Sequence, residues 1–152
     1  MNRNIAREMA VQAVFSASLS NLPVDEFLKT FFCEDHFLSL QTVDELYEEM
    51  PKGKMMDYIS RTSKGVFEHI LEIDALIGNA SKGWSVSRLS GTARAVLRVA
   101  VFEMLFAEDV PVGAAINSAI EIEKKYDDPE VVSFVNGVLG TISKKTGKHE
   151  LK

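Results

Sequence analysis

The sequence has few of the residues that would indicate a disulfide-bonded, metal-binding or membrane protein. Cys33 is its single cysteine, so the chain can form no internal disulfide and offers no cluster of thiolate ligands for a metal. No run of about 18 apolar residues occurs, which argues against a transmembrane helix. The basic residues that follow Met1 lead into no apolar run, so we expect no signal peptide. These absences predict a cytoplasmic protein that does not enter a membrane.

The sequence also lacks the residue groups of a catalytic site. Its histidines, His36, His69 and His149, are scattered and have no acidic or Cys neighbours at ligand spacing. Glu121 and Glu123 cannot face each other on a helix, and no phosphate-binding or dinucleotide-binding loop is present. We therefore predict that the chain is not an enzyme and has no cofactor or metal site.

The apolar residues of the chain follow helical periods. At 152 residues and 46% hydrophobic content, the chain has the size of one domain that folds without disulfides. Residues 4–19, 55–78 and 93–106 each carry an apolar stripe at helical spacing, and further helices are expected after Pro111 and Pro129. We also expect a helix to begin within 43–50, and a short helix with a joint within 81–92. No segment predicts a strand, so the domain is predicted to be all-α.

Two asparagines and two glycines interrupt the apolar patterns of the last two helices. Asn117 and Asn136 lie among apolar residues and are predicted to be hydrogen-bonded core amides that fix helix register. Gly137 and Gly140 are spaced like a clamp for an RNA backbone, but apolar residues stand between them. Close helix packing is the predicted role of these glycines.

Charge is distributed unevenly along the chain. The net charge is −5, with 7 basic and 13 acidic residues in 1–80 against 10 and 9 in 81–152. Arg3 and Arg7 are four residues apart and are expected to share a helix face away from the apolar stripe. Arg88, Arg94 and Arg98 lie in a stretch without acidic residues. By their spacing, these arginines either contact phosphates and unpaired bases, or are solvated charges whose stems cover apolar surface.

Three segments together resemble the NusB family. Residues 7–15, REMAVQAVF, are similar to the family's opening helix, ARExAxQxLY/F. Residues 84–89, WSVSRL, and the following 95–104 resemble the segment W-S-x-x-R-L … LRxAxYEL. Residues 110–111, VP, 116–122, INSAIEI, and 134–139, FVNGVL, are similar to the family's VP … INEAIEL … FVNGVL. The resemblance covers both ends and most of the second half, in the family's order.

The resemblance implies both a fold and a function. It implies about seven helices in two packed lobes of a single domain, 1–152, with an N-terminal lobe at about 1–80, a C-terminal lobe at about 81–146 and a tail at 147–152. In the NusB family, the protein pairs with NusE, a small-subunit ribosomal protein. The pair binds the boxA element of nascent RNA and helps RNA polymerase read through terminators, notably on ribosomal RNA operons. This chain is accordingly expected to bind single-stranded boxA-type RNA and NusE within an antitermination complex of RNA polymerase.

The matched positions predict two sets of contact residues. The residues expected to contact RNA are Arg3, Arg7, Gln12, Arg88, Arg94 and Arg98. The residues expected on the NusE face are Phe15, Glu130 and Phe134.

Departures from the family pattern leave a second interpretation open. Asn4 and Ile5 stand where many members carry arginine, and Ser118 replaces the glutamate of INEA. The alternative is therefore a protein–protein interaction module with the NusB fold and weak or no RNA binding. A NusB-like domain also opens an RNA cytosine methyltransferase, but the catalytic domain of that enzyme is absent from this sequence. A homodimer is possible too, because some family members dimerise through surfaces that would cover the RNA site.

Overall fold

The computed structural model describes residues 1–81 and 89–146 of the chain. Its described residues form eight α-helices and one 3-10 helix and contain no strand, so the predicted all-α fold is confirmed. The elements are α1 (Arg3–Ser18), α2 (Val24–Phe31), α3 (Glu34–Leu40), η1 (Glu45–Tyr47), α4 (Gly53–Glu68), α5 (Ile70–Ala80), α6 (Gly91–Phe106), α7 (Val112–Tyr126) and α8 (Pro129–Thr146). None of these helices is both long and apolar enough to cross a bilayer.

The ends of the helices follow local sequence signals. The side chain of Asn2 accepts a hydrogen bond from the Ile5 amide at 2.9 Å and caps α1, and Ser90 caps α6 by accepting from the Ala93 amide at 3.0 Å. Pro111 directly precedes α7 and Pro129 is the first residue of α8. The expected helix starts after Pro111 and at Pro129 are therefore confirmed, since proline at a helix start costs no intrahelical hydrogen bond.

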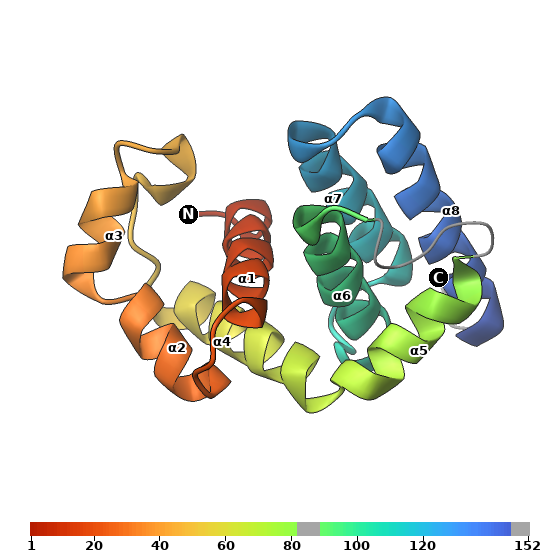
Figure 1. The fold of residues 1–152 in the computed structure, drawn as a ribbon, viewed down its shortest axis with the longest axis horizontal. Helices are drawn as coiled ribbons and strands as arrows, with labels where there is room; N and C mark the ends of the chain where they lie inside the picture. The colour runs from red at the N-terminus through yellow and green to blue at the C-terminus, as the bar shows by residue number, and fades with distance from the viewer. Residues whose placement is uncertain (82–88, 147–152) are drawn as a thin grey trace.

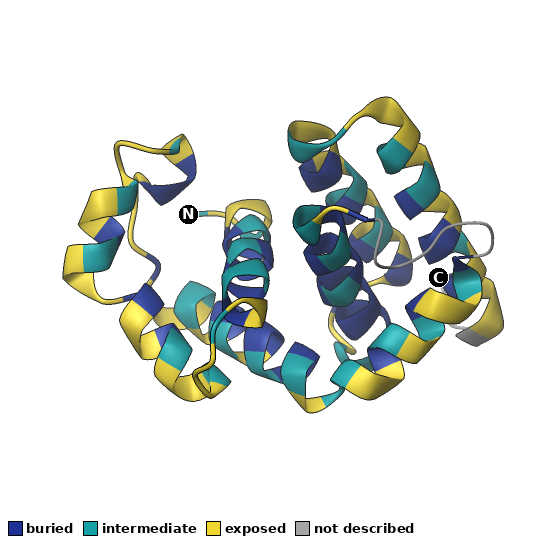
Figure 2. Ribbon diagram, viewed as in Figure 1, coloured by how far each residue is buried: buried dark blue, intermediate teal, exposed yellow. Residues whose placement is uncertain are grey.

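Helix α1 lies between two hydrophobic clusters and belongs to both. In Figure 1 it stands in the middle of the molecule, with α2 and α3 on one side and α6, α7 and α8 on the other. One side of α1 joins the first cluster with α2, α3, η1 and part of α4, through the side chains of Ala6, Met9, Ala10 and Ala13. Another side joins the second cluster with α5 to α8, through Val11 and Val14. Figure 2 shows α6 as the most completely buried helix, whereas α2 and α3 expose much of their surface.

The helix predicted over residues 55–78 is divided at His69, which is a correction to the sequence analysis. The chain turns there because His69 leaves helical geometry and stacks on the Phe106 ring, with centroids 3.9 Å apart. The turn brings Ile73 and Ile77 of α5 into the second cluster beside α6 and α8. This division gives eight α-helices where about seven were expected. The division into lobes at about residue 80 stays a prediction.

Two other helices were expected from the sequence, one beginning within 43–50 and one within 81–92. The helix expected to begin within 43–50 is wrong: only the single 3-10 turn η1 forms, and α4 starts later, at Gly53, whose φ of +58° favours glycine. The short helix and joint expected in 81–92 fall mostly on residues 82–88, outside the described residues. Helix α6 nevertheless begins at Gly91, within that range.

Candidate nucleic-acid interface

Arg7, near the start of α1, forms a buried ion pair with Glu103 of α6. Its Nε and Nη2 donate to the two carboxylate oxygens of Glu103 at 2.6 and 3.1 Å, which is the bidentate arrangement favoured by guanidinium and carboxylate. Arg7 is 5% exposed and Glu103 is fully buried. Such a pair holds only while both partners are present, because either charge alone would be buried without compensation.

Further polar groups complete the surroundings of this pair. Nη1 of Arg7 donates to Asn4 Oδ1 at 3.2 Å and to Ser118 Oγ of α7 at 2.8 Å, and the Tyr58 hydroxyl of α4 donates to Glu103 Oε2 at 3.0 Å. Burial by itself lowers the pKa of Arg7, but the hydrogen bonds and charge of Glu103 outweigh it and raise the pKa. Arg7 is therefore a fixed cation that links α1, α4, α6 and α7.

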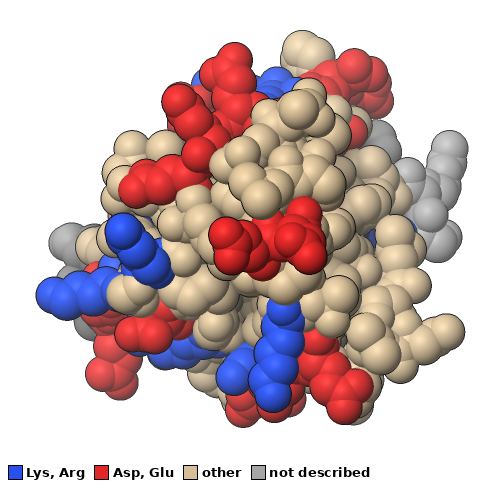
Figure 3. Space-filling view, turned by 90° about the vertical axis from the view of Figure 1, so that its left-hand side faces the viewer, with Lys and Arg blue, Asp and Glu red and all other residues tan. Residues whose placement is uncertain are grey.

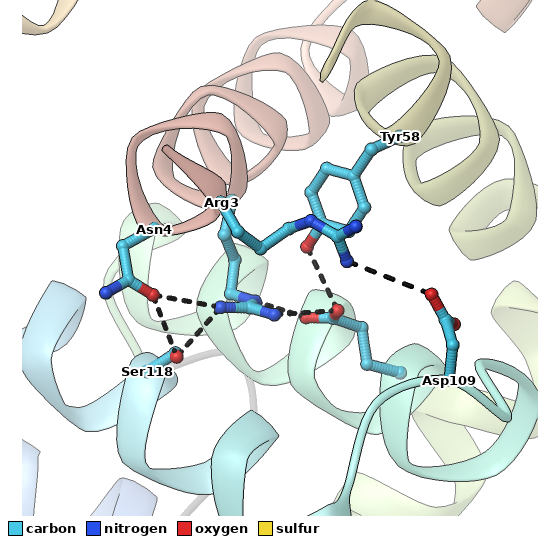
Figure 4. Close-up of polar contacts among 7 residues, drawn as sticks. Arg3, Asn4, Tyr58, Asp109 and Ser118 are labelled. Carbon is cyan, nitrogen blue, oxygen red and sulfur yellow. Dashed lines mark hydrogen bonds and ion pairs between the residues drawn. The ribbon is translucent and has the colours of Figure 1, made fainter. Parts of the chain in front are cut away.

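Arg3, one turn earlier on α1, lies in a more open position. Figure 4 shows its guanidinium over the Tyr58 ring and directed towards Asp109. The guanidinium carbon is 4.4 Å from the ring centroid, and Nη1 is 4.0 Å from the nearest Asp109 oxygen. The side chain is 40% exposed. A partly exposed pair at this distance contributes little stability, so the guanidinium can exchange Asp109 for another anion at small cost.

Arg3 and Arg7 share a helix face as expected, but Arg7 does not lie away from the buried side of α1. Both guanidinium groups lie near the Tyr58 ring, at 4.4 and 5.8 Å from its centroid, but only Arg3 faces solvent. Arg7 points into the seam between α1 and α6 because Glu103 and Ser118 supply acceptors there. In its present arrangement Arg7 offers no donor to a phosphate at the surface.

The remaining residues expected to contact RNA lie elsewhere. Arg98 of α6 forms a bidentate pair with Asp74 of α5, with both distances 2.9 Å. Arg94 is half-buried in the first turn of α6, where Nη2 donates to the Leu89 carbonyl at 3.4 Å. Gln12 is half-buried beside Tyr126. Arg88 lies outside the described residues, so the structure brings together only Arg3 and Arg7 of the six.

The residues expected on a partner face occupy two places. Phe15 of α1 is half-buried and its ring covers Gly91 at the start of α6; a methyl group on Gly91 would lie 2.3 Å from the ring. Glu130 is exposed in the first turn of α8, and Phe134 is half-buried against the second hydrophobic cluster. Their role in binding a partner stays a prediction.

A groove between α7 and α8 overturns the predictions for the asparagines and glycines. Asn117 and Asn136 are exposed and line this groove of about 910 Å³ with Lys124 and apolar side chains such as Ile120 and Val132. They are therefore surface amides and not core amides. A methyl group on Gly137 or Gly140 would meet nothing within 4 Å, so close packing does not explain these glycines either.

Sequence reasoning did not single out Glu103, although its position carries a signal. Glu103 follows Ala100 by three residues and precedes Met104, inside the apolar stripe of α6. A carboxylate in such a stripe requires a buried partner, and Arg7 is a basic residue similarly placed in an apolar helix. Tyr58 and Asn4 carry no comparable signal, since their contacts depend on how the helices pack.

A second buried glutamate, Glu123 of α7, forms no ion pair with any of the described residues. It is fully buried, and among those residues the carboxyl group of Asp127 is the polar neighbour that affects its oxygens. Burial raises the pKa of Glu123 to about 9, and the neighbouring carboxyl group of Asp127 adds to the rise. Glu123 is therefore protonated at neutral pH.

Comparison with known proteins decides the family. The model of the NusB family matches residues 4–144. This chain belongs to the NusB family. It is 34% identical to the transcription antitermination protein NusB of Bacillus subtilis over 93% of this chain and 95% of that protein. It is 37% identical to the transcription antitermination protein NusB of an Exiguobacterium species, over 95% of this chain and 99% of that protein.

Solved NusB structures have the same fold. A structure of T. maritima NusB superposes with a TM-score of 0.77 at 30% identity, covering 99% of this chain and 98% of that one. A structure of the antitermination factors NusB and NusE in complex with dsRNA superposes with a TM-score of 0.74 at 25% identity, covering 94% of this chain and 96% of that one. The predicted NusB-like bundle is confirmed.

Proposed function

We propose that this protein is a transcription antitermination factor without catalytic activity, which binds boxA-type single-stranded RNA together with NusE. Bound in this way, it would promote read-through by RNA polymerase on ribosomal RNA operons. The observation that carries the proposal is the match to NusB antitermination proteins over more than nine-tenths of the chain. The solved assembly of a NusB with NusE and dsRNA, which has the same fold, supports NusE and RNA as partners, whereas the single-stranded boxA element rests on the family resemblance.

The geometry at the start of α1 assigns different roles to its two arginines. Arg3 is the residue that we expect to contact RNA, since it is exposed and held only by a long contact to Asp109 and by the Tyr58 ring. Arg7 acts as a positioning residue, because its pair with Glu103 fixes the helix that carries Arg3. NusE would add further contacts near Phe15, Glu130 and Phe134. A second protein raises RNA affinity when it completes the surface that faces the phosphates.

One observation favours the alternative, a protein–protein interaction module of the NusB fold with weak RNA binding. Arg7 and Arg98 are each engaged by a carboxylate in a bidentate pair, so two of the predicted RNA contacts are already occupied. Under this alternative the protein binds NusE, but RNA gains little affinity from its presence.

The test is fluorescence anisotropy of a labelled boxA-type RNA with the protein alone and with equimolar NusE, at two salt concentrations. Arg3→Ala is the informative variant because its side chain supports little of the fold. We expect it to weaken binding and to reduce the slope of log affinity against log salt by about 0.7, the value for one phosphate contact on a single strand. Arg61→Ala is the matched control, since Arg61 is an exposed arginine on α4.

The outcomes separate the two functions. Selective binding of boxA over a scrambled RNA, strengthened by NusE and weakened by Arg3→Ala, supports antitermination. If NusE binds but boxA never exceeds the scrambled RNA, the interaction module is the better description. If neither NusE nor RNA binds, the proposal fails.

A further inference from the structure

The opposite end of the molecule, formed by α2, α3 and η1, carries a groove lined with aromatic rings. Its volume is about 440 Å³, within the range of roughly 300–1,000 Å³ that is common for ligand pockets. Phe31 lies at the centre of the aromatic group, with ring centroids 5.4 Å from Phe27, 5.2 Å from His36 and 6.4 Å from Tyr47. Tyr126 of α7 and Val43, which is 74% exposed, complete an apolar wall.

Carboxylates surround this groove. Between residues 20 and 50 the sequence has eight acidic residues and one basic residue, Lys29. Figure 3 looks onto this end of the molecule and shows red carboxylates at the centre and top of a largely uncharged surface, with blue side chains mainly towards its left and lower edges. Next to the groove along the chain, a hollow of about 390 Å³ is lined by Gln41, Glu45 and Glu48. Both glutamates are exposed.

The titration of a groove residue agrees with a negative potential there. The pKa of Tyr47 is raised to about 12, first by burial and then by the charges of Asp44 and Glu8. Lys125, which precedes the groove residue Tyr126, is held by Glu8 at 2.6 Å and by Asp44 at 3.4 Å. Lys125 therefore does not reverse the sign of the charge around the groove.

The aromatic groove and the carboxylates around it together indicate the chemistry of the partner that would bind there. Aromatic rings with few polar groups fit a bulky apolar side chain, whereas exposed carboxylates beside them fit Lys or Arg. The phosphates of RNA would be repelled by the same carboxylates, and a second copy of this acidic end would be repelled as well. We propose that the groove is a docking site for a cationic protein segment, which inserts an aromatic or large aliphatic side chain beside Phe31 and sets basic side chains against Glu45 and Glu48.

This surface does not include Arg3 at the start of α1. Arg3 contacts Tyr58 of α4 and Asp109, which follows α6, and neither residue lines the groove. Gln12, which was also expected to contact RNA, does line the groove. Occupation of the groove is therefore compatible with RNA bound at Arg3 but competes with a contact between RNA and Gln12.

The test is a selection of short random peptides displayed on phage against the full chain, followed by titration of the enriched peptide by anisotropy. We expect the enriched peptides to carry net positive charge and one large apolar anchor. Thr30→Trp should weaken the peptide at least about tenfold, because Thr30 is exposed at the groove and a bulky ring there fills it. The double variant Glu45→Lys/Glu48→Lys should weaken it as well, most strongly at low salt.

Control variants carry the same changes elsewhere. Leu71→Trp adds a ring at a residue of α5 that is 86% exposed, and Glu68→Lys reverses an exposed charge on α4. Both should leave peptide binding unchanged. If Thr30→Trp does not fold, Val43→Arg tests the same groove at a solvent-exposed position.

Several results would overturn the proposal. Enriched peptides without a positive bias, or peptides that bind the groove-filled variant as tightly as the parent, would place the binding surface elsewhere. Loss of boxA RNA binding in Thr30→Trp would assign the groove to nucleic acid. A dimer in sedimentation that becomes a monomer in Thr30→Trp would assign it to a second copy of this chain. The antitermination proposal is tested by RNA and NusE titrations with Arg3 variants, and the groove proposal by peptide titrations with Thr30 and Glu45/Glu48 variants. Failure of one set of titrations therefore does not imply failure of the other.

Discussion

Glu103 and Glu123 are both fully buried glutamates on neighbouring helices, but the groups that surround their carboxyl groups differ. Glu103 accepts two hydrogen bonds from Arg7 and one from Tyr58 in the seam between α1 and α6. Glu123 has no cationic partner among the described residues, and burial and the Asp127 carboxyl group raise its pKa to about 9. A buried carboxyl group can be accommodated by a matched partner or by a proton, and the choice depends on what the facing helix supplies.

The difference shows which of the two carboxyl groups holds the fold together. The seam at Glu103 joins residues of α1, α4, α6 and α7, so its loss affects several helices at once. Among the described residues the oxygens of Glu123 interact only with the nearby Asp127 carboxyl group, so its removal has a local effect. The predictions that follow are ordered from the largest expected effect to the smallest.

Breaking the seam should have the largest effect. Arg7→Ala leaves Glu103 buried without its cation and should lower the free energy of unfolding by about 3–5 kcal/mol, measured by urea denaturation. The triple variant Arg7→Met/Glu103→Leu/Tyr58→Phe removes both charges and the Tyr58 hydroxyl together, while Ser118 still donates to Asn4. It should recover much of that loss. A triple variant no more stable than Arg7→Ala would show that the seam contributes more than compensation of a buried charge.

Replacing the protonated acid should have little effect near pH 5 and an effect that grows as the pH rises. The folded pKa of Glu123 is raised from 4.5 to about 9, so its stability contribution is present in full below about pH 4.5 and is lost as pH rises towards 9. Glu123→Gln cannot ionise and should become progressively more stable than the parent over that window, by up to about 1 kcal/mol per pH unit. Urea denaturation at about pH 5 and about pH 8.5 measures the difference. Equal pH dependence in both proteins would contradict the raised pKa.

The half-exposed pair between Arg98 and Asp74 should matter less than the buried seam. It has the same bidentate geometry as Arg7 and Glu103, but its side chains are 14% and 38% exposed. Arg98→Ala should therefore lower the free energy of unfolding by about 1 kcal/mol or less, and added salt should shrink the effect. A loss as large as that of Arg7→Ala would mean that geometry, and not burial, determines the strength of these pairs.

Arg3→Ala should have the smallest effect on stability. Its contacts are a stacking interaction with Tyr58 and a long contact to Asp109, together expected to contribute about 0.5–1 kcal/mol. Thermal unfolding of Arg3→Ala beside Arg7→Ala provides the comparison. If the two variants melt together, the assignment of Arg3 to binding and Arg7 to structure is wrong.

The sequence predicted the helices better than it predicted the environments of the charges. The starts of α7 and α8 follow from Pro111 and Pro129, which act locally. The turn at His69 was missed because the apolar period continues through it, and only the stacking on Phe106 and the position of α6 explain it. Helical spacing predicts which residues share a face, but not what that face meets.

At the candidate site, too, helical spacing did not predict what each side chain contacts. Arg3 and Arg7 are related by one helical turn, and nothing in their spacing distinguishes an exposed arginine from a buried one. The distinction comes from Glu103, which is 96 residues from Arg7 in sequence. Likewise, Asn117 and Asn136 lie in apolar contexts but face the groove between α7 and α8, since the angle between two packed helices is not encoded in either one alone.

The position of α1 between the two hydrophobic clusters has a consequence for the order in which the protein folds during synthesis. Its polar partners lie far along the chain: Arg7 meets Ser118 across 111 residues, and Glu8 accepts a hydrogen bond from Tyr126 across 118 residues. Contacts between residues so far apart in sequence form late in folding, because the chain first pays the entropic cost of closing the long loop between them. Helix α1 precedes α6 and α7 in the chain, so its packing against them waits until both have been synthesised. Until α6 emerges, the apolar residues Val11 and Val14 of α1 remain accessible to chaperones.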